Sequence, residues 1–205
     1  MVQFWYEFAS SYSYPAAMRV EEEAEQRGIA IEWRPFLLGP LFKEQQGLSD
    51  SPFNEVAVKG RYMWRDLERI CASLKIPFSR PMKFPQNGLA AARLALVGLR
   101  EGWGKDFSRA VFRANFAEGL DIGDPGVLEP IVRACGGDPR SSRMKANSDE
   151  IKDKLRGNVD TARARGIFGA PTFVCDDGEL FWGNDRLEQA LDWACEHEYA
   201  GRAAL

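Results

Sequence analysis

The order of its first elements constrains the fold of this chain more than any other feature. Residues 2–8 alternate large apolar side chains, with Trp5 on the opposite face, and this period of two predicts a strand inside a sheet. Pro15 suits the first turn of the helix that follows, and Gly28 suits its end. Residues 29–36 alternate again and predict a second strand. A strand, a helix and a strand in this order favour a parallel pair.

The middle of the chain has helical periodicity interrupted by proline and glycine, and none of its segments predicts a strand. About five helices are expected there, at residues 55–74, 89–100, 107–117, 127–135 and 150–165. The strand pattern then returns. Residues 171–175 and 179–182 flank an Asp-Asp-Gly turn and predict a hairpin. In the last helix, Asp185 and Glu188 have the spacing of an N-terminal capping box.

The whole order predicts an α/β fold: strand-helix-strand, a helical insertion, then strand-strand-helix. This is the topology of a thioredoxin-like fold with an all-helical insertion after the second strand. We expect residues 1–37 and 166–205 to form the thioredoxin-like domain and residues 38–165 to form the helical insertion domain.

Composition excludes several classes of function. The net charge of −3, with acidic and basic residues interspersed, argues against a nucleic-acid partner or an anionic membrane. No apolar run approaches the ~20 residues of a transmembrane helix, and the N-terminus lacks a signal-peptide pattern, so we expect a cytoplasmic protein. His197 is the only histidine, which argues against a metal site and against a Ser-His-Asp triad.

Serines stand where a redox enzyme would carry cysteines. Ser10 and Ser13 lie three residues apart at the strand-to-helix turn, the position of Cys-x-x-Cys in redox enzymes with a thioredoxin-like fold. Serine cannot form a disulfide, so a sulfur used at this turn must come from a ligand. Taken locally, these serines are more typical of a helix N-cap. The cysteines lack this spacing and are expected to be reduced thiols, at Cys71, Cys135, Cys175 and Cys195.

Four segments in this order resemble one family. They are EFASSYSY at residues 7–14, KGRYMWRDL at 59–67, GIFGAPTF at 166–173 and WGNDRL at 182–187. The chain resembles, over nearly its whole length, the 2-hydroxychromene-2-carboxylate isomerases and the kappa-class glutathione transferases of the DsbA-like thioredoxin superfamily. Each segment is weak by itself, whereas their order and spacing together are specific.

The resemblance implies a glutathione site. The active-site serine of the family falls on Ser10, and the proline expected in the cis form falls on Pro171, where the Ala170 backbone would offer strand-like hydrogen bonds to the cysteinyl unit. The family usually has proline after its serine, but this chain has Ser11, so either Ser10 or Ser11 could face the sulfur. The remaining implied contacts are Asn54, in the loop after the second strand, and Asn184 and Asp185, at the glutamyl end of glutathione.

The chemistry of the site requires a lowered thiol pKa, since only the thiolate is a good nucleophile. The Ser10 hydroxyl and the N-terminus of the following helix would both favour the thiolate. The resemblance implies an isomerase in which glutathione is a cofactor: its thiolate adds reversibly to an unsaturated aromatic-derived carboxylate, a small molecule. It also implies a homodimer, with Tyr62, Trp64 and Arg65 as one candidate contact.

Three alternatives remain open. A glutathione transferase would use the same thiolate to conjugate an electrophile and would consume glutathione. A non-catalytic thiol-peptide binder or holdase would keep the fold without the chemistry. A serine hydrolase built on Ser10 is the least favoured, because no G-x-S-x-G segment exists and His197 is the only imidazole.

Overall fold

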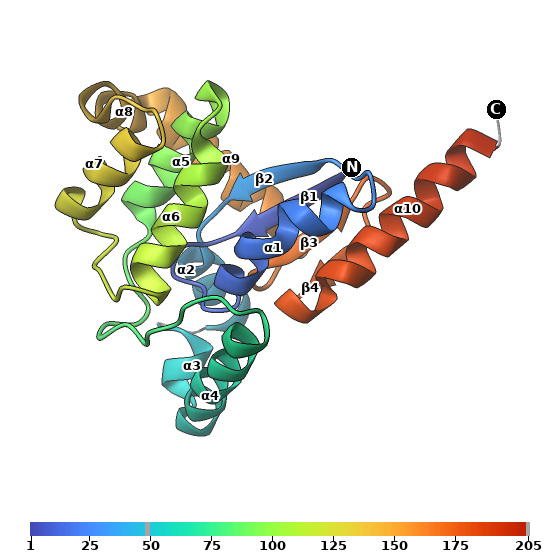
Figure 1. Cartoon of the computed structure of the whole chain (residues 1–205), viewed down its shortest axis with the longest axis horizontal. Helices are drawn as coiled ribbons and strands as arrows, with labels where there is room; N and C mark the ends of the chain where they lie inside the picture. Colours follow the sequence, from blue (N-terminus) through green and yellow to red (C-terminus); the bar gives the residue numbers. More distant parts are fainter. Residues whose placement is uncertain (48–49, 204–205) are drawn as a thin grey trace.

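A mixed four-stranded sheet forms the centre of the chain (Figure 1). The computed structural model describes residues 1–47 and 50–203. The strands are β1 (Val2–Tyr6), β2 (Ile31–Pro35), β3 (Thr172–Cys175) and β4 (Leu180–Trp182). Their order is β2-β1-β3-β4. β1 is parallel to β2 and antiparallel to β3, and β3 pairs antiparallel with β4, which confirms the predicted parallel pair and hairpin.

Helices cover both faces of the sheet. Consecutive side chains of β1 point to opposite faces, so β1 packs against helices on each side. Phe4 packs in one cluster with residues of α1 (Ser13–Glu25) and α10 (Leu187–Ala203). Trp5 packs in a second cluster with residues of α9 (Asp149–Ala164). Although α9 falls within the stretch expected to be an insertion, it lies on the sheet, and the division into two domains stays a prediction.

Between β2 and α9 the described residues form helices and no strand. Four expected helices are α4 (Ala57–Ser73), α5 (Leu89–Glu101), α6 (Gly104–Phe116) and α7 (Pro125–Ala134), and α9 is the fifth. The sequence analysis missed the short α2 (Leu38–Leu41), a π-helical turn, η1 (Phe42–Gln46), α3 (Pro52–Glu55) and α8 (Pro139–Ala146). Helix α8 has little apolar periodicity, and its N-cap is its signal: Asp138 accepts a hydrogen bond from the Ser141 N–H at 2.7 Å.

Of two predicted helix starts, one is confirmed and one needs correction. Helix α1 begins at Ser13, with Pro15 in its first turn as predicted, and the Ser10 carbonyl and hydroxyl oxygens accept from the Ser13 N–H at 3.2 and 3.3 Å. The capping box at Asp185 is not formed among the described residues. Asp185 lies inside a 3-10 turn, η2 (Asn184–Arg186), whose N-cap residue is Gly183 and which has no side-chain cap.

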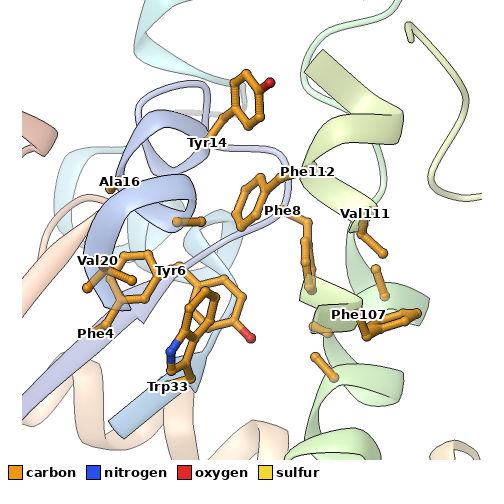
Figure 2. Close-up of a cluster of buried hydrophobic side chains, with 14 of the residues drawn as sticks. Phe4, Tyr6, Phe8, Tyr14, Ala16, Val20, Trp33, Phe107, Val111 and Phe112 are labelled. Carbon is orange, nitrogen blue, oxygen red and sulfur yellow. The ribbon is translucent and has the colours of Figure 1, made fainter. Parts of the chain in front are cut away.

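An aromatic core joins the sheet to the helical part (Figure 2). The Phe8 ring lies 5.1 Å from that of Phe112 on α6, centroid to centroid. The Tyr6 hydroxyl and the Ser108 hydroxyl are 2.8 Å apart and hydrogen bonded. Because β1 ends in this packed cluster, the turn that follows it has a fixed place between the sheet and α6.

The tryptophans of the chain differ in burial. Trp5 and Trp64 are buried, but Trp182 is 51% exposed and rests edge-on against the Phe168 ring at 4.8 Å. Of the helices in residues 1–47 and 50–203, none is both long enough and apolar enough to cross a membrane.

Candidate functional site

The two predicted halves of the site meet at Ser10. Its hydroxyl donates to the Ala170 carbonyl oxygen at 2.8 Å and accepts from the Ser13 N–H at 3.3 Å. The Ala170–Pro171 peptide bond is cis, as expected; Phe84–Pro85 is also cis and was not expected. One half-buried hydroxyl therefore links the start of α1 to a segment 160 residues away in the sequence.

Three contacts hold the turn that carries Ser10. The Asn115 side-chain amide of α6 donates to the Phe8 carbonyl oxygen at 3.0 Å. The Ser10 N–H donates to the Glu7 carbonyl oxygen at 3.0 Å. A Cβ built at Gly88 would lie 3.3 Å from the Phe8 Cβ, so the loop before α5 packs closely on this turn. The position of Ser10 is set by the sheet and by the helices together.

The three serines of this turn have different surroundings. Ser11 is buried, and its hydroxyl donates to the Met63 sulfur of α4 at 3.0 Å. Ser13 is also buried, and its hydroxyl oxygen has no hydrogen-bond partner among the described residues. Only Ser10 is in contact with the Ala170 loop. The geometry thus separates Ser10, which faces the loop, from Ser11, which faces α4.

Backbone donors surround Ser10. Within the described part of the chain, the N–H groups of Ser11 and Tyr12 have no hydrogen-bond partner, as expected for the first turn of a helix. The Tyr12 hydroxyl is turned away and donates to an Asp66 carboxylate oxygen at 3.0 Å. Burial, reinforced by Asp66, raises the Tyr12 pKa. Positive helix-end polarity and a hydroxyl donor meet here, which suits an anion such as a thiolate.

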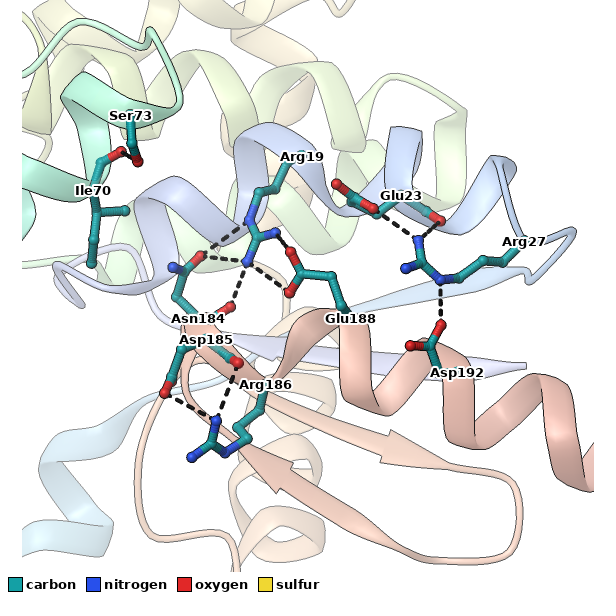
Figure 3. A network of polar contacts seen from close by, with 10 residues as sticks. All are labelled: Arg19, Glu23, Arg27, Ile70, Ser73, Asn184, Asp185, Arg186, Glu188 and Asp192. Atoms are coloured by element: carbon teal, nitrogen blue, oxygen red, sulfur yellow. Dashed lines mark hydrogen bonds and ion pairs between the residues drawn. The ribbon is translucent and has the colours of Figure 1, made fainter.

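The Ala170 loop and the turn that holds Asn184 and Asp185 lie side by side, at the two ends of the β3–β4 hairpin. The Gly183 N–H donates to the Pro171 carbonyl oxygen at 2.9 Å. Asn184 is 6% exposed, and its side chain faces Arg19 of α1, whereas the Asp185 carboxylate is exposed (Figure 3). Hydrogen bonds therefore join Ser10 to the Ala170–Pro171 loop, and that loop to Gly183, the residue before η2.

Asn54 is the predicted residue that the structure places apart. It lies on α3, and its amide nitrogen donates to the Asp50 carboxylate and to the Phe84 carbonyl oxygen, both at 2.9 Å. Among the described residues no contact joins Asn54 to Ser10 or to the Ala170 loop. Both hydrogens of its amide are already used, so only its oxygen remains to accept a hydrogen bond.

The thiols of the chain do not take part in this site. All four cysteines are free, as expected. Burial raises the pKa of Cys71 to about 11 and that of Cys175 to about 12, and it also raises the pKa of Cys135. These thiols stay protonated at neutral pH and are poor nucleophiles. His197 stacks on Trp193 near the C-terminus, with ring centroids 4.1 Å apart, and no group of metal-binding side chains occurs within the described ranges.

Sequence reasoning missed two charged residues at the site. Arg19 contacts both Asn184 and Glu188. Glu7 precedes the serine turn, and its carboxylate accepts from the Leu38 N–H at 3.0 Å. Burial raises the Glu7 pKa to about 7, an effect that the Leu38 hydrogen bond only partly offsets. The only sequence signal for Glu7 was a charged residue at the end of a strand with bulky side chains on both faces.

The family model, the sequence relatives and the solved structure that match this chain agree with one another. A family model described as a DsbA-like thioredoxin domain matches residues 1–192. The chain is 30% identical over 187 residues to a 2-hydroxychromene-2-carboxylate isomerase of Sphingobium xenophagum, covering 91% of this chain and 94% of that protein. It is 27% identical to glutathione S-transferase kappa 2 of Caenorhabditis elegans, covering 96% and 92%. A solved structure of 2-hydroxychromene-2-carboxylate isomerase matches with a TM-score of 0.84 at 25% identity, covering 97% of this chain and 98% of that one.

Proposed function

Because this chain belongs to the DsbA-like thioredoxin family, together with the 2-hydroxychromene-2-carboxylate isomerases and the kappa-class glutathione transferases, we propose that it is a glutathione-dependent isomerase. Its substrate is an unsaturated, aromatic-derived carboxylate. The observation that carries this proposal is the Ser10 hydroxyl, which sits at the N-terminus of α1 and touches the Ala170 loop. Burial raises the pKa of Cys71, Cys135 and Cys175, and no hydrogen bond joins a described cysteine to Ser10, so the reactive sulfur is the ligand's.

The residues present suit a glutathione cofactor. When bound here, glutathione would supply a thiolate, the nucleophile for reversible addition to an unsaturated carbon. Ser10 and the two unpartnered N–H groups of Ser11 and Tyr12 stabilise negative charge at the start of α1. The exposed Asp185 carboxylate suits an ammonium group.

The single proton of the Ser10 hydroxyl has one acceptor at a time. It now serves the Ala170 carbonyl oxygen. To donate to a sulfur anion, the hydroxyl must release this oxygen, which then accepts an N–H of the bound cysteinyl peptide. The exchange keeps every polar group paired, so it has a low cost.

A transferase reaction is the second candidate, favoured by the 27% identity to a kappa-class enzyme. The two reactions share the thiolate and differ in the fate of glutathione. The deciding experiment follows the geometric isomers of unsaturated aromatic 2-oxo acids by ultraviolet absorbance, with and without glutathione, while free thiol is titrated. We expect isomer conversion that requires glutathione at constant thiol. Thiol loss matching product formation identifies a transferase, and thiol binding without either reaction identifies a non-catalytic binder or holdase.

We further propose a cytoplasmic homodimer, a setting in which the four free thiols stay reduced. The proposed contact on α4 needs one change. Trp64 is buried against Phe84, with ring centroids 4.9 Å apart, whereas Tyr62 and Val58 are 63% and 62% exposed. The contact we propose is therefore the Val58, Tyr62 and Arg65 face of α4. Sedimentation as a monomer at micromolar concentration contradicts it.

A further inference from the structure

Arg19 links α1 to the turn that carries Asn184 and Asp185 (Figure 3). Its side chain is only 13% exposed. The guanidinium Nη2 donates to the Asn184 backbone oxygen at 2.6 Å, and both Nη groups bond the Glu188 carboxylate of α10. A buried guanidinium with planar, fork-like donors holds its partners in one geometry, which a flexible lysine would not do.

The same guanidinium sets the orientation of the Asn184 amide. Arg19 Nε and Nη2 lie 3.4 and 3.3 Å from the Asn184 Oδ1. A guanidinium only donates, so the amide oxygen must face it, and a flipped amide would place donors against donors. Figure 3 draws the Asn184 nitrogen on the side away from Arg19. That Nδ2 has no hydrogen-bond partner within the described part of the chain and is not a fully buried atom.

Two neighbouring residues of η2 therefore present opposite chemistry. Asn184 offers an N–H donor, held by Arg19. Asp185 offers a carboxylate whose side chain is 73% exposed and which, among the described residues, forms an ion pair only with the adjacent Arg186, at 3.2 Å. A donor suits a carboxylate and an acceptor suits an ammonium group, and the free α-amino acid end of a γ-glutamyl peptide carries both.

We propose that Arg19 is a positioning residue that makes this turn specific for the α-carboxylate of a γ-glutamyl thiol, by keeping the Asn184 Nδ2 turned towards the ligand. Asp185 recognises the α-ammonium group independently of Arg19. This inference rests on the proposed glutathione site.

Arg27, in the turn that directly follows α1, is a matched control. It also ties α1 to α10, through the Asp192 carboxylate at 2.7 Å, and it bonds Glu23 at 2.8 Å. It makes no contact with η2 among the described residues. Replacing either arginine removes a link between the two helices, but only Arg19 holds the Asn184 amide.

The experiment measures, by calorimetry, the binding of three thiols to the full chain and to its Arg19→Met and Arg27→Met variants. The thiols are glutathione, 4-aminobutyryl-Cys-Gly, which lacks the glutamyl α-carboxylate, and glutaryl-Cys-Gly, which lacks the α-amino group. We expect Arg19→Met to weaken glutathione binding roughly tenfold, the size of one charge-assisted hydrogen bond. Arg19→Met should bind 4-aminobutyryl-Cys-Gly as tightly as the unmodified chain does. It should also still bind glutathione more tightly than glutaryl-Cys-Gly. Arg27→Met should keep both preferences of the unmodified chain.

Asn184→Asp provides a second variant if Arg19→Met does not fold. It leaves an oxygen facing Arg19 and replaces the donor by an acceptor, so it should lose the same carboxylate preference. The inference is overturned if both Arg19→Met and Asn184→Asp keep the wild-type ratio between glutathione and 4-aminobutyryl-Cys-Gly, or weaken all three thiols equally. If the unmodified chain binds none of the thiols, the proposed function itself fails.

Discussion

The two ends of the candidate site are built from different interactions. At the Ser10 end, neutral hydroxyls and N–H groups dominate: the Ser13 hydroxyl has no partner among the described residues, and the Ser10 hydroxyl has one acceptor that it can exchange. At the Asn184 end, a guanidinium and a carboxylate fix the turn through five hydrogen bonds from Arg19. A reacting sulfur needs donors that can change partner, whereas recognition of the remote end of the ligand needs fixed groups.

This difference predicts that the Ser10 end controls turnover more than binding. In Ser10→Ala the charge-assisted hydrogen bond to the thiolate is lost, an interaction worth about 1.5 to 3 kcal/mol. We expect turnover to fall roughly ten- to a hundredfold, with a smaller change in glutathione affinity. The ultraviolet absorbance of the bound thiolate near neutral pH should fall as well, because the thiol pKa rises.

Ser11→Ala is the control for that experiment. Its hydroxyl bonds the Met63 sulfur, a weak acceptor, so the expected loss is about 1 kcal/mol or less of stability and no loss of turnover. If Ser11→Ala were inactive and Ser10→Ala active, the other serine would face the sulfur. If both variants kept full turnover, neither Ser10 nor Ser11 would stabilise the thiolate.

Glu7 makes the Ser10 end sensitive to pH. Its pKa is raised from 4.5 to about 7 in the folded chain, mainly by burial. The folded state thus holds a proton that the unfolded state releases, so stability is greatest at low pH and falls as pH rises from about 4.5 to about 7. We expect a loss of about 3 kcal/mol, at about 1.36 kcal/mol per pKa unit. Urea unfolding across this range measures it.

Glu7→Gln should remove this part of the pH dependence, because glutamine does not titrate. Glu25→Gln, on the exposed face of α1, is the matched control and should leave the pH dependence as it is. Equal slopes for the unmodified chain and Glu7→Gln would show that folding does not change the pKa of Glu7.

Ligand stabilisation compares the two ends directly. Glutathione at about ten times its dissociation constant should stabilise the fold by about 1.4 kcal/mol. S-methylglutathione keeps the glutamyl end but has no thiolate, so it should bind by the Asn184 end alone and raise the melting temperature less. Calorimetric melting at matched concentrations tests this. A melting temperature that millimolar glutathione does not move contradicts the site, and equal shifts for both ligands contradict the role of the Ser10 end.

The sequence predicted those segments of the candidate site whose positions follow from the order of strands and helices. The serine turn, the loop at Pro171 and the turn at Asn184 follow from strand and helix patterns, and the structure brings them together. Arg19 could not be found in this way. Glu22 and Glu23 lie three and four residues after it, at local pairing distance, yet its partner Glu188 is 169 residues away.

Exposure was the second property that the sequence could not predict. Tryptophan is usually a core residue, but Trp182 packs against a glycine of the loop. A Cβ built at Gly169 would lie 2.3 Å from the Trp182 Nε1. The indole therefore rests on the backbone of Gly169, beside Ala170, and leaves one face exposed. Only the tertiary placement of the loop decides this, because β4 is an edge strand of the sheet.

Replacing Ser13 should have the smallest effect of the substitutions at the Ser10 end. Its buried hydroxyl has no partner among the described residues, and an unpaired buried polar group costs stability. Ser13→Ala should therefore leave stability unchanged or raise it by up to about 1 kcal/mol, with turnover unchanged, as measured by urea unfolding and by isomerisation rate. A fall in turnover without a fall in stability would mean that Ser13 is a second donor to the sulfur. The Ser10 end would then have two hydroxyl donors that can change partner, and it would differ even more from the charged Asn184 end.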